Sequence, residues 1–246
     1  MSTLLVPLGI GRGDVVAAVG AGGKTSLVYA LAAEAREQGL RVLVTTTTHM
    51  GTLPEATTGP LFVESDGVSD ASIEAALRDH GRATILGRRV RADKLEGLPP
   101  ERVDALASCA DLVLIEADGA RGRSLKAPAA HEPVVPASAS ILVVLAALDV
   151  LGTPAGGERV HRPEIVGRLT GLGPDEPVTE DALAACLAHP DGYPARIRAG
   201  LRAVVFLNKV EDAARDAAAE RIAGRLCPPY AAVVAGSARG HARRLR

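Results

Sequence analysis

The sequence predicts an α/β fold, a three-layer sandwich in which a mainly parallel sheet is covered by helices on both faces. Apolar runs rich in β-branched residues have the length of buried strands, and amphipathic helical patterns separate them. Strands that alternate with helices in this way form parallel sheets. A glycine-rich turn follows the first strand, at the edge where parallel sheets bind their ligands.

The apolar runs and helical patterns place the expected elements along the chain. We expect strands at residues 15–19, 41–46, 60–63, 83–86, 111–115, 141–145, 203–207 and 231–234. We expect helices at residues 24–38, 70–79, 100–107, 179–188 and 212–226. Residues 160–200 are rich in proline and glycine, have the pattern of short helices and interrupt the alternation. We therefore expect one domain over residues 1–246 with a small helical insertion at 160–200, either a lid or a surface elaboration.

Composition and charge restrict the class of protein. The chain has 246 residues, and its charged content of 23% is ordinary for a globular protein. Its formal net charge of -1 offers no basic field for nucleic acid. The longest apolar runs are too short to span a bilayer, and no basic stretch precedes the N-terminal apolar run, so we expect no membrane partner and no signal peptide. The basic segment 239–246 is expected to be a frayed, solvated end.

Cysteine usage favours a reducing compartment. Cys109, Cys186 and Cys227 are far apart in the sequence and show no C-x-x-C spacing. This spacing argues against a disulfide framework and against a zinc knuckle. We therefore expect a cytoplasmic protein.

Residues 15–26 have the order of a phosphate-binding loop: a buried strand, a glycine-rich turn, and then Lys24 and Thr25 at the start of a helix. The glycines let backbone N–H groups turn toward an anion, and the helix N-terminus adds its dipole. Lys24 supplies a charge for the outer phosphates, and Thr25 supplies a hydroxyl ligand for Mg²⁺. The candidate nucleotide contacts of this loop are Gly20, Ala21, Gly22, Gly23, Lys24, Thr25 and Ser26.

The loop is a shortened form of the common phosphate-loop pattern. The pattern G-x-x-x-x-G-K-[ST] has glycine six positions before its lysine, where this chain has Ala18. The loop is therefore better written G-x-x-G-K-T, from Gly20 to Thr25. The alternative is a glycine-rich turn that binds no ligand, but the order of strand, glycines, Lys-Thr and helix favours phosphate binding.

Two carboxylates end the strand expected at 111–115. Glu116 and Asp118 are two residues apart, so on a continuing strand both side chains share one face. In phosphate-loop proteins this position holds Mg²⁺, directly or through water, and can polarise an attacking water. We therefore expect Lys24, Glu116 and Asp118 to be catalytic, with Thr25, Glu116 and Asp118 as metal ligands. The alternative is an acidic turn exposed to solvent.

Polar loops at the same edge of the sheet supply candidates for contact with substrate or phosphate. One loop follows the second strand, one follows the two carboxylates, and one begins the insertion. These candidates are Thr46, Thr47, His49, Arg121, Lys126, His131, His161 and Arg162. The alternatives are solvated loop residues and, for the threonines, residues that simply suit a strand.

The strand expected at 203–207 ends in a motif that resembles the guanine-reading Asn-Lys-x-Asp of GTP-binding proteins. Asn208 and Lys209 match it, and Glu211 stands where Asp is usual. Ser237 and Ala238, after the last predicted strand, resemble the Ser-Ala-Lys loop that supports the base in those proteins. The two motifs favour GTP over ATP as the bound nucleotide.

Several segments, in order along most of the chain, resemble the YqeC family, described as selenium-cofactor biosynthesis or selenium-dependent hydroxylase accessory proteins. The matching segments are VGAGGKT at 19–25, VTTTTHM at 44–50, EADGAR at 116–121, LKAP at 125–128, HEPVVP at 131–136, LDVLG at 148–152, HRPE at 161–164 and LNK at 207–209. The resemblance implies a P-loop NTPase-like fold. It also implies a role in the maturation of molybdenum hydroxylases that carry a labile selenium cofactor, with such a hydroxylase or its maturation proteins as partners.

Three functions remain open from the sequence. The first is a Mg²⁺-dependent GTPase or ATPase that assists insertion or maturation of the selenium cofactor. The second is an ATP-dependent ligase or kinase, because the short G-x-x-G-K-T loop also occurs in the amide-forming Mur ligases, although the chain lacks their additional domains. The third is a scaffold that senses nucleotide without hydrolysing it.

Overall fold

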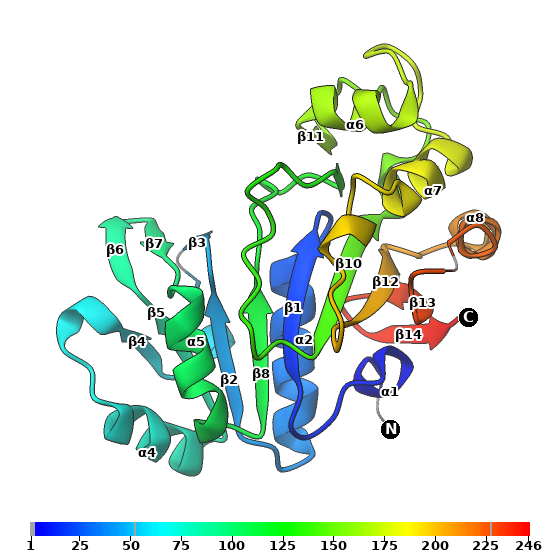
Figure 1. Cartoon of the computed structure of the whole chain (residues 1–246). Coiled ribbons are helices and arrows are strands. Elements are labelled where there is room, and N and C mark those ends of the chain that lie inside the picture. Colours follow the sequence, from blue (N-terminus) through cyan, green and yellow to red (C-terminus); the bar gives the residue numbers. More distant parts are fainter. Residues whose placement is uncertain (1–2, 52, 227) are drawn as a thin grey trace.

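A computed structural model describes residues 3–51, 53–226 and 228–246 of the chain, so Cys227 lies outside the described residues. Within them the strands form a nine-stranded sheet in the order β14-β13-β12-β10-β1-β8-β2-β5-β4 (Figure 1). Only the pairing of β13 with β14 is antiparallel in this sheet. The predicted mainly parallel α/β sandwich, typical of P-loop NTPases, is confirmed.

The main sheet consists of β1 (Val15–Gly20), β2 (Val42–Thr46), β4 (Leu61–Val63), β5 (Arg82–Leu86), β8 (Leu112–Glu116), β10 (Ile141–Ala147), β12 (Arg202–Asn208), β13 (Ala232–Ser237) and β14 (His241–Arg244). The α-helices are α1 (Leu5–Leu8), α2 (Lys24–Glu37), α3 (Glu55–Thr58), α4 (Asp70–His80), α5 (Pro100–Leu106), α6 (Pro163–Thr170), α7 (Glu180–Ala188) and α8 (Ala213–Ala223). Short 3-10 turns are η1 (Glu64–Asp66), η2 (Ala107–Cys109), η3 (Leu148–Val150) and η4 (Pro194–Arg196).

Each face of the sheet is buried under its own set of helices. Along β1, Ala17 and Val19 pack into the core that includes residues of α4, α5, α7 and α8, whereas Val16 and Ala18 pack into the core with α1 and α2. Figure 1 shows α2 behind the strands and α5 in front of them. A strand covered on both sides needs apolar residues at every position, which explains why the parallel strands appear in the sequence as unbroken apolar runs.

The helices begin where the sequence provides caps. The hydroxyl of Ser69 accepts a hydrogen bond from the backbone N–H of Ser72 at the start of α4. Thr179 and Asp212 cap α7 and α8 in the same way. α4 ends at Gly81, whose positive φ of 69° closes the last turn. Such caps satisfy N–H and C=O groups that have no partner inside the helix.

The C-terminal expectation was wrong. Residues 241–244 form β14, which pairs with β13 in antiparallel register from Ser237↔His241 to Val234↔Arg244. Arg243 adds ion pairs to Asp216 and Glu220 of α8. The tail is therefore an edge strand, and its basic side chains partner α8 and protect an exposed sheet edge.

Two small sheets lie near the carboxyl ends of the main strands. β3 (His49–Gly51), β7 (Lys94–Glu96) and β6 (Arg88–Arg91) form one, and β9 (Leu125–Lys126) with β11 (Val160–His161) forms the other. Residues 160–200 contain α6 and α7, and they lie between β10 and β12, which are neighbours in the main sheet. Among the described residues no helix combines the length and apolarity that a membrane crossing requires.

Candidate functional site

The glycine-rich loop between β1 and α2 has a backbone that only glycine permits. Gly20, Gly22 and Gly23 have φ angles of 91°, 90° and 121°. A Cβ on Gly22 would lie 2.8 Å from the backbone nitrogen of Ala147, and one on Gly20 would overlap the carbonyl oxygen of Leu145. The loop is thus pressed against the end of β10, and its glycines serve both conformation and close approach.

Lys24 is folded back into this loop. Its Nζ donates to the carbonyl oxygen of Gly20 at 2.6 Å and lies 3.1 Å from Asp118 Oδ1 and 3.9 Å from Glu116 Oε1. The side chain is only 3% exposed. The two carboxylates that follow β8 therefore meet the same ammonium group, because β8 pairs directly with β1.

The hydroxyl of Thr25 donates to Glu116 Oε2 at 2.8 Å. Burial raises the pKa of Glu116 above its ordinary value, although the charge of Lys24 and the Thr25 hydroxyl oppose that rise. Asp118 differs, because its carboxylate is fully buried and accepts the backbone N–H of Gly20 at 3.0 Å. Glu116 thus keeps the more accessible carboxylate beside Thr25, while Asp118 holds the loop.

Asp118 begins a chain of buried charges that runs away from the loop, here called the buried ion chain: Lys24, Asp118, Lys126, Glu132 and Arg162. Lys126 Nζ lies 3.0 Å from Asp118 Oδ2 and 2.9 Å from Glu132 Oε2, and it donates to the carbonyl oxygen of Gly119 at 2.6 Å. Glu132 pairs in turn with Arg162, whose Nη2 lies 3.2 Å from Glu132 Oε1. Alternating signs compensate the cost of burying each charge.

Glu132 is a strongly stabilised carboxylate. Burial alone would raise its pKa, but hydrogen bonds from Arg162 and Lys126 and the charge of Lys126 lower the pKa to about 2. Glu132 is absent from the sequence-based candidates. Its role depends on the burial of Lys126, which has no local signal in the sequence.

Asn208, at the end of β12, joins two loops. Its Nδ2 donates to the carbonyl oxygen of Gly22 at 2.6 Å, and its Oδ1 accepts the backbone N–H of Ala238 at 2.9 Å. Lys209 has a positive φ of 60°, and its Nζ lies 2.8 Å from Asp149 Oδ2. Asp149 is thus the acidic partner of Lys209.

The remaining base candidates lie near this junction. The carboxylate of Glu211 is 58% exposed and reaches Arg215 only at 3.5 Å. Ser237 ends β13, and its hydroxyl accepts the backbone N–H of Arg239 at 3.3 Å. A hollow of about 440 Å³ borders Lys209, Arg121 and Arg123.

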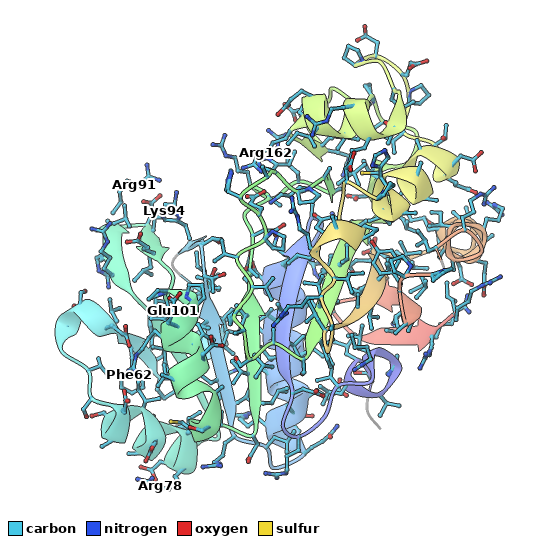
Figure 2. All side chains as sticks on the ribbon, in the orientation of Figure 1. Phe62, Arg78, Arg91, Lys94, Glu101 and Arg162 are labelled. Atoms are coloured by element: carbon cyan, nitrogen blue, oxygen red, sulfur yellow. The ribbon has the colours of Figure 1, made fainter. Side chains whose placement is uncertain are left out.

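A larger cavity of about 1220 Å³ opens beside Thr25 and Glu116. Its lining brings together many of the sequence-based candidates from separate segments: Thr25, Ser26, His49, Glu116, Arg121, His131, His161 and Arg162. Thr48 and Arg123 of the same polar loops also line it, and so do Lys94, Glu132 and Glu164, which were not among the candidates. Figure 2 shows Lys94 and Arg162 near the carboxyl ends of the strands, far from Arg78 at the opposite end.

Other candidates do not line this cavity. Thr46 donates through its hydroxyl to the carbonyl oxygen of Glu116 at 2.6 Å, and Thr47 donates to that of Val134 at 2.7 Å. Lys126 is fully buried in the ion chain. The backbone N–H of Ala21, in the loop, donates to the carbonyl oxygen of Leu145 in β10. These residues support the walls of the site.

Oxygen donors suited to a hard cation are present, although they are few. The Thr25 hydroxyl and the Glu116 carboxylate adjoin each other, and Mg²⁺ commonly takes one or two such protein ligands and completes its shell with phosphate and water. Within residues 3–51, 53–226 and 228–246, no group of three or more histidine, cysteine or acidic side chains forms a ready-made metal centre. The donor set therefore fits a cation that arrives with a phosphate ligand.

The parallel sheet and the strand–glycine loop–helix unit define an α/β protein of the P-loop NTPase-like class. The family model described as "YqeC protein" matches residues 16–164. A protein of Escherichia coli (strain K12), described as "Uncharacterized protein YqeC", is 37% identical over 212 residues, which cover 85% of this chain and 81% of that protein. The chain belongs to the YqeC family, as its sequence motifs predicted.

Proposed function

We propose that this chain is a Mg²⁺-dependent nucleotide-binding protein that hydrolyses GTP or ATP. The observation that carries the proposal is the glycine loop with Lys24 and Thr25 adjoining Glu116 at the carboxyl edge of the sheet. Backbone N–H groups at the start of α2 and the ammonium of Lys24 would bind phosphates. Catalysis would come chiefly from positioned charges, as is usual in phosphoryl transfer.

Thr25 and Glu116 would hold the magnesium ion in this proposal. A bound Mg²⁺ would neutralise charge on the phosphate oxygens. Asp118 is fully buried and already occupied by Gly20, Lys24 and Lys126, so its role would be to position Lys24. This division of labour separates two carboxylates that the sequence alone treats as equivalent.

The base would lie on the β12–β13 side of the loop. Asn208 is buried and already bonded to both loops that it joins, so it would support nucleotide binding through the loop, whatever the base. Glu211 is the exposed carboxylate of this region and would be the group that pairs with guanine. The choice between GTP and ATP therefore rests on Glu211.

Family membership supplies the biological setting of the proposal. We connect the nucleotide cycle to the maturation of selenium-dependent molybdenum hydroxylases, with a hydroxylase or one of its maturation proteins as partner. Nucleotide state could order the loops that line the large cavity and thereby control such a partner. The protein would act in the cytoplasm.

Calorimetric titration with GTP and with ATP, each with Mg²⁺, tests the proposal, and phosphate release measures hydrolysis. Lys24→Ala should remove most of the affinity, because it deletes the loop cation. Arg78→Ala is the matched control, since that cation is exposed at the opposite end of the sheet. Affinity that survives in Lys24→Ala would remove the phosphate-loop assignment, and tight binding without hydrolysis would favour the scaffold.

A ligase or kinase is the second candidate function. The large cavity favours it, because the cavity adjoins Thr25 and Glu116 and is roomy enough for an acceptor substrate. Turnover that requires an added acceptor, and is absent with nucleotide alone, would support this function over a simple hydrolase.

A further inference from the structure

The cavity beside Thr25 lies on the opposite side of the loop from the base candidates. β1 carries the loop and stands between β8 and β10, and the strands continue to β2 on one side and to β12 and β13 on the other. Glu116 and His49 follow β8 and β2 and line the cavity, whereas Asn208 and Ser237 end β12 and β13. A nucleotide with its base near Glu211 would thus turn its terminal phosphate toward the cavity.

The cavity wall is cationic. Its charged lining comprises Lys94, Arg121, Arg123, Arg162, Glu116, Glu132 and Glu164, and three histidines, His49, His131 and His161, add to it. Two of the carboxylates are already engaged, Glu116 by Thr25 and Glu132 by Lys126 and Arg162. Among the described residues, by contrast, no hydrogen bond or ion pair engages the side chains of Lys94 and Arg121. We call this wall the cationic pocket.

His161 lines the cationic pocket and lies among more positive than negative side chains. Burial is the main cause that lowers its pKa below the ordinary value, and the charges of Lys126, Arg162 and Arg121 lower it further. Glu132 opposes these charges only in part. An anion placed among these groups would offset the surplus charge that they create.

Backbone conformation sets the cations in place. In the described part of the chain, the non-glycine residues with left-handed φ are Arg121 (50°), Arg162 (56°) and Lys209 (60°). All three are cations, and each lines one of the two hollows around the loop. Left-handed backbone at a large side chain costs of order 1 kcal/mol or more and concentrates where function requires it.

We propose that the cationic pocket binds a second substrate, a small molecule with an oxyanion group, beside the terminal phosphate of the nucleotide. The oxyanion is a phosphate or a carboxylate, since an arginine guanidinium recognises both. The cavity volume of about 1220 Å³ exceeds the common range of ligand pockets, so it accommodates a molecule as large as an organic cofactor. The position of this substrate relative to the nucleotide rests on the proposed function.

Nuclear magnetic resonance of the histidine side chains tests the proposal. His161→Gln assigns the His161 signals, and the intact protein is titrated with inorganic phosphate and, separately, with acetate at constant ionic strength. We expect a saturable shift of the His161 signals with at least one of the two anions. The same shift should persist in Arg78→Gln, which removes a remote exposed cation.

Arg121→Gln supplies the decisive comparison. Loss of a charged hydrogen-bonding group from the pocket should weaken binding of the anion that gives the shift by about tenfold. The proposal is overturned by no saturable shift with either anion, or by equal affinity in Arg121→Gln and wild type. A response to phosphate alone or to acetate alone identifies which oxyanion the pocket takes.

Nucleotide titrations of the same samples keep the two proposals apart. A saturable His161 response without nucleotide binding would retain the pocket and remove the proposed NTPase function. Nucleotide binding without a saturable His161 response would remove the proposed pocket and leave the proposed NTPase function standing.

Discussion

Replacing Glu132 by glutamine tests the buried ion chain. The carboxylate lies between Lys126, 2.9 Å away, and Arg162, and its side chain is 8% exposed. Glutamine keeps the size of the side chain but removes its charge. The two cations then lose their shared counter-charge in a place that water scarcely reaches.

The magnitude follows from the pKa of Glu132. A folded-state value of about 2, against an ordinary value of 4.5, corresponds to about 3 kcal/mol of stability at neutral pH. Loss of one partner from a buried ion pair independently costs about 3–5 kcal/mol. Because the pKa is lowered in the folded state, this stabilisation is complete above about pH 4.5 and is lost as the pH falls through about 2.

Urea unfolding at pH 7 and at pH 3 measures the effect. We expect Glu132→Gln to lower the free energy of unfolding by about 3 kcal/mol at pH 7, and about half of that difference should remain at pH 3. Glu101→Gln is the matched control, because it makes the same change at an exposed position on α5 (Figure 2). A loss below about 1 kcal/mol at pH 7, or a difference that does not change between the two pH values, would refute the reasoning.

Four further variants probe the loop and its neighbours. Gly22→Ala should lower the urea midpoint and abolish nucleotide binding, since a Cβ would collide with Ala147; unchanged binding would contradict the tight seat of the loop. Asn208→Ala should destabilise the fold by about 2–3 kcal/mol, because two hydrogen bonds are lost. It should also weaken the binding of GTP and of ATP equally, and a loss of affinity for GTP alone in calorimetry would contradict this. Glu211→Ala should weaken the binding of GTP but not of ATP, and an equal loss for both nucleotides would count against its role. Thr25→Val should raise the Mg²⁺ concentration for half-maximal hydrolysis by about tenfold. An unchanged Mg²⁺ requirement in Thr25→Val would count against Thr25 as a metal ligand.

The long parallel strands could be predicted because burial on both faces leaves a one-dimensional signal. β8 and β10 are apolar at nearly every position, so their place in the sequence was evident. The exposed strands carry no such signal. Arg88–Arg91 is exposed at all four positions, and two of the four residues of β14 are arginine, so only pairing with a neighbour makes them strands.

The site was predictable where the chemistry is local in the sequence. The glycines, Lys24 and Thr25 are consecutive, and Glu116 ends a strand that had to lie near them. Burial of Lys126 could not be foreseen, because it depends on Glu132 and Asp118 folding around it. The roles of Glu116 and Asp118 likewise separate only in three dimensions, where one adjoins Thr25 and the other is enclosed.

The charges around the glycine loop balance without any ligand. Lys24, Lys126 and Arg162 face three carboxylates, those of Glu116, Asp118 and Glu132. A balanced network of this kind needs no bound anion to stay folded, so the loop would be prepared before a nucleotide arrived, and ordering the loop would not reduce the affinity. A bound phosphate would instead attract Lys24 away from Asp118. The carboxylate of Asp118 would then interact more strongly with Lys126. The strength of the Glu132–Arg162 ion pair, at the other end of the buried ion chain, would then depend on whether a nucleotide occupies the loop.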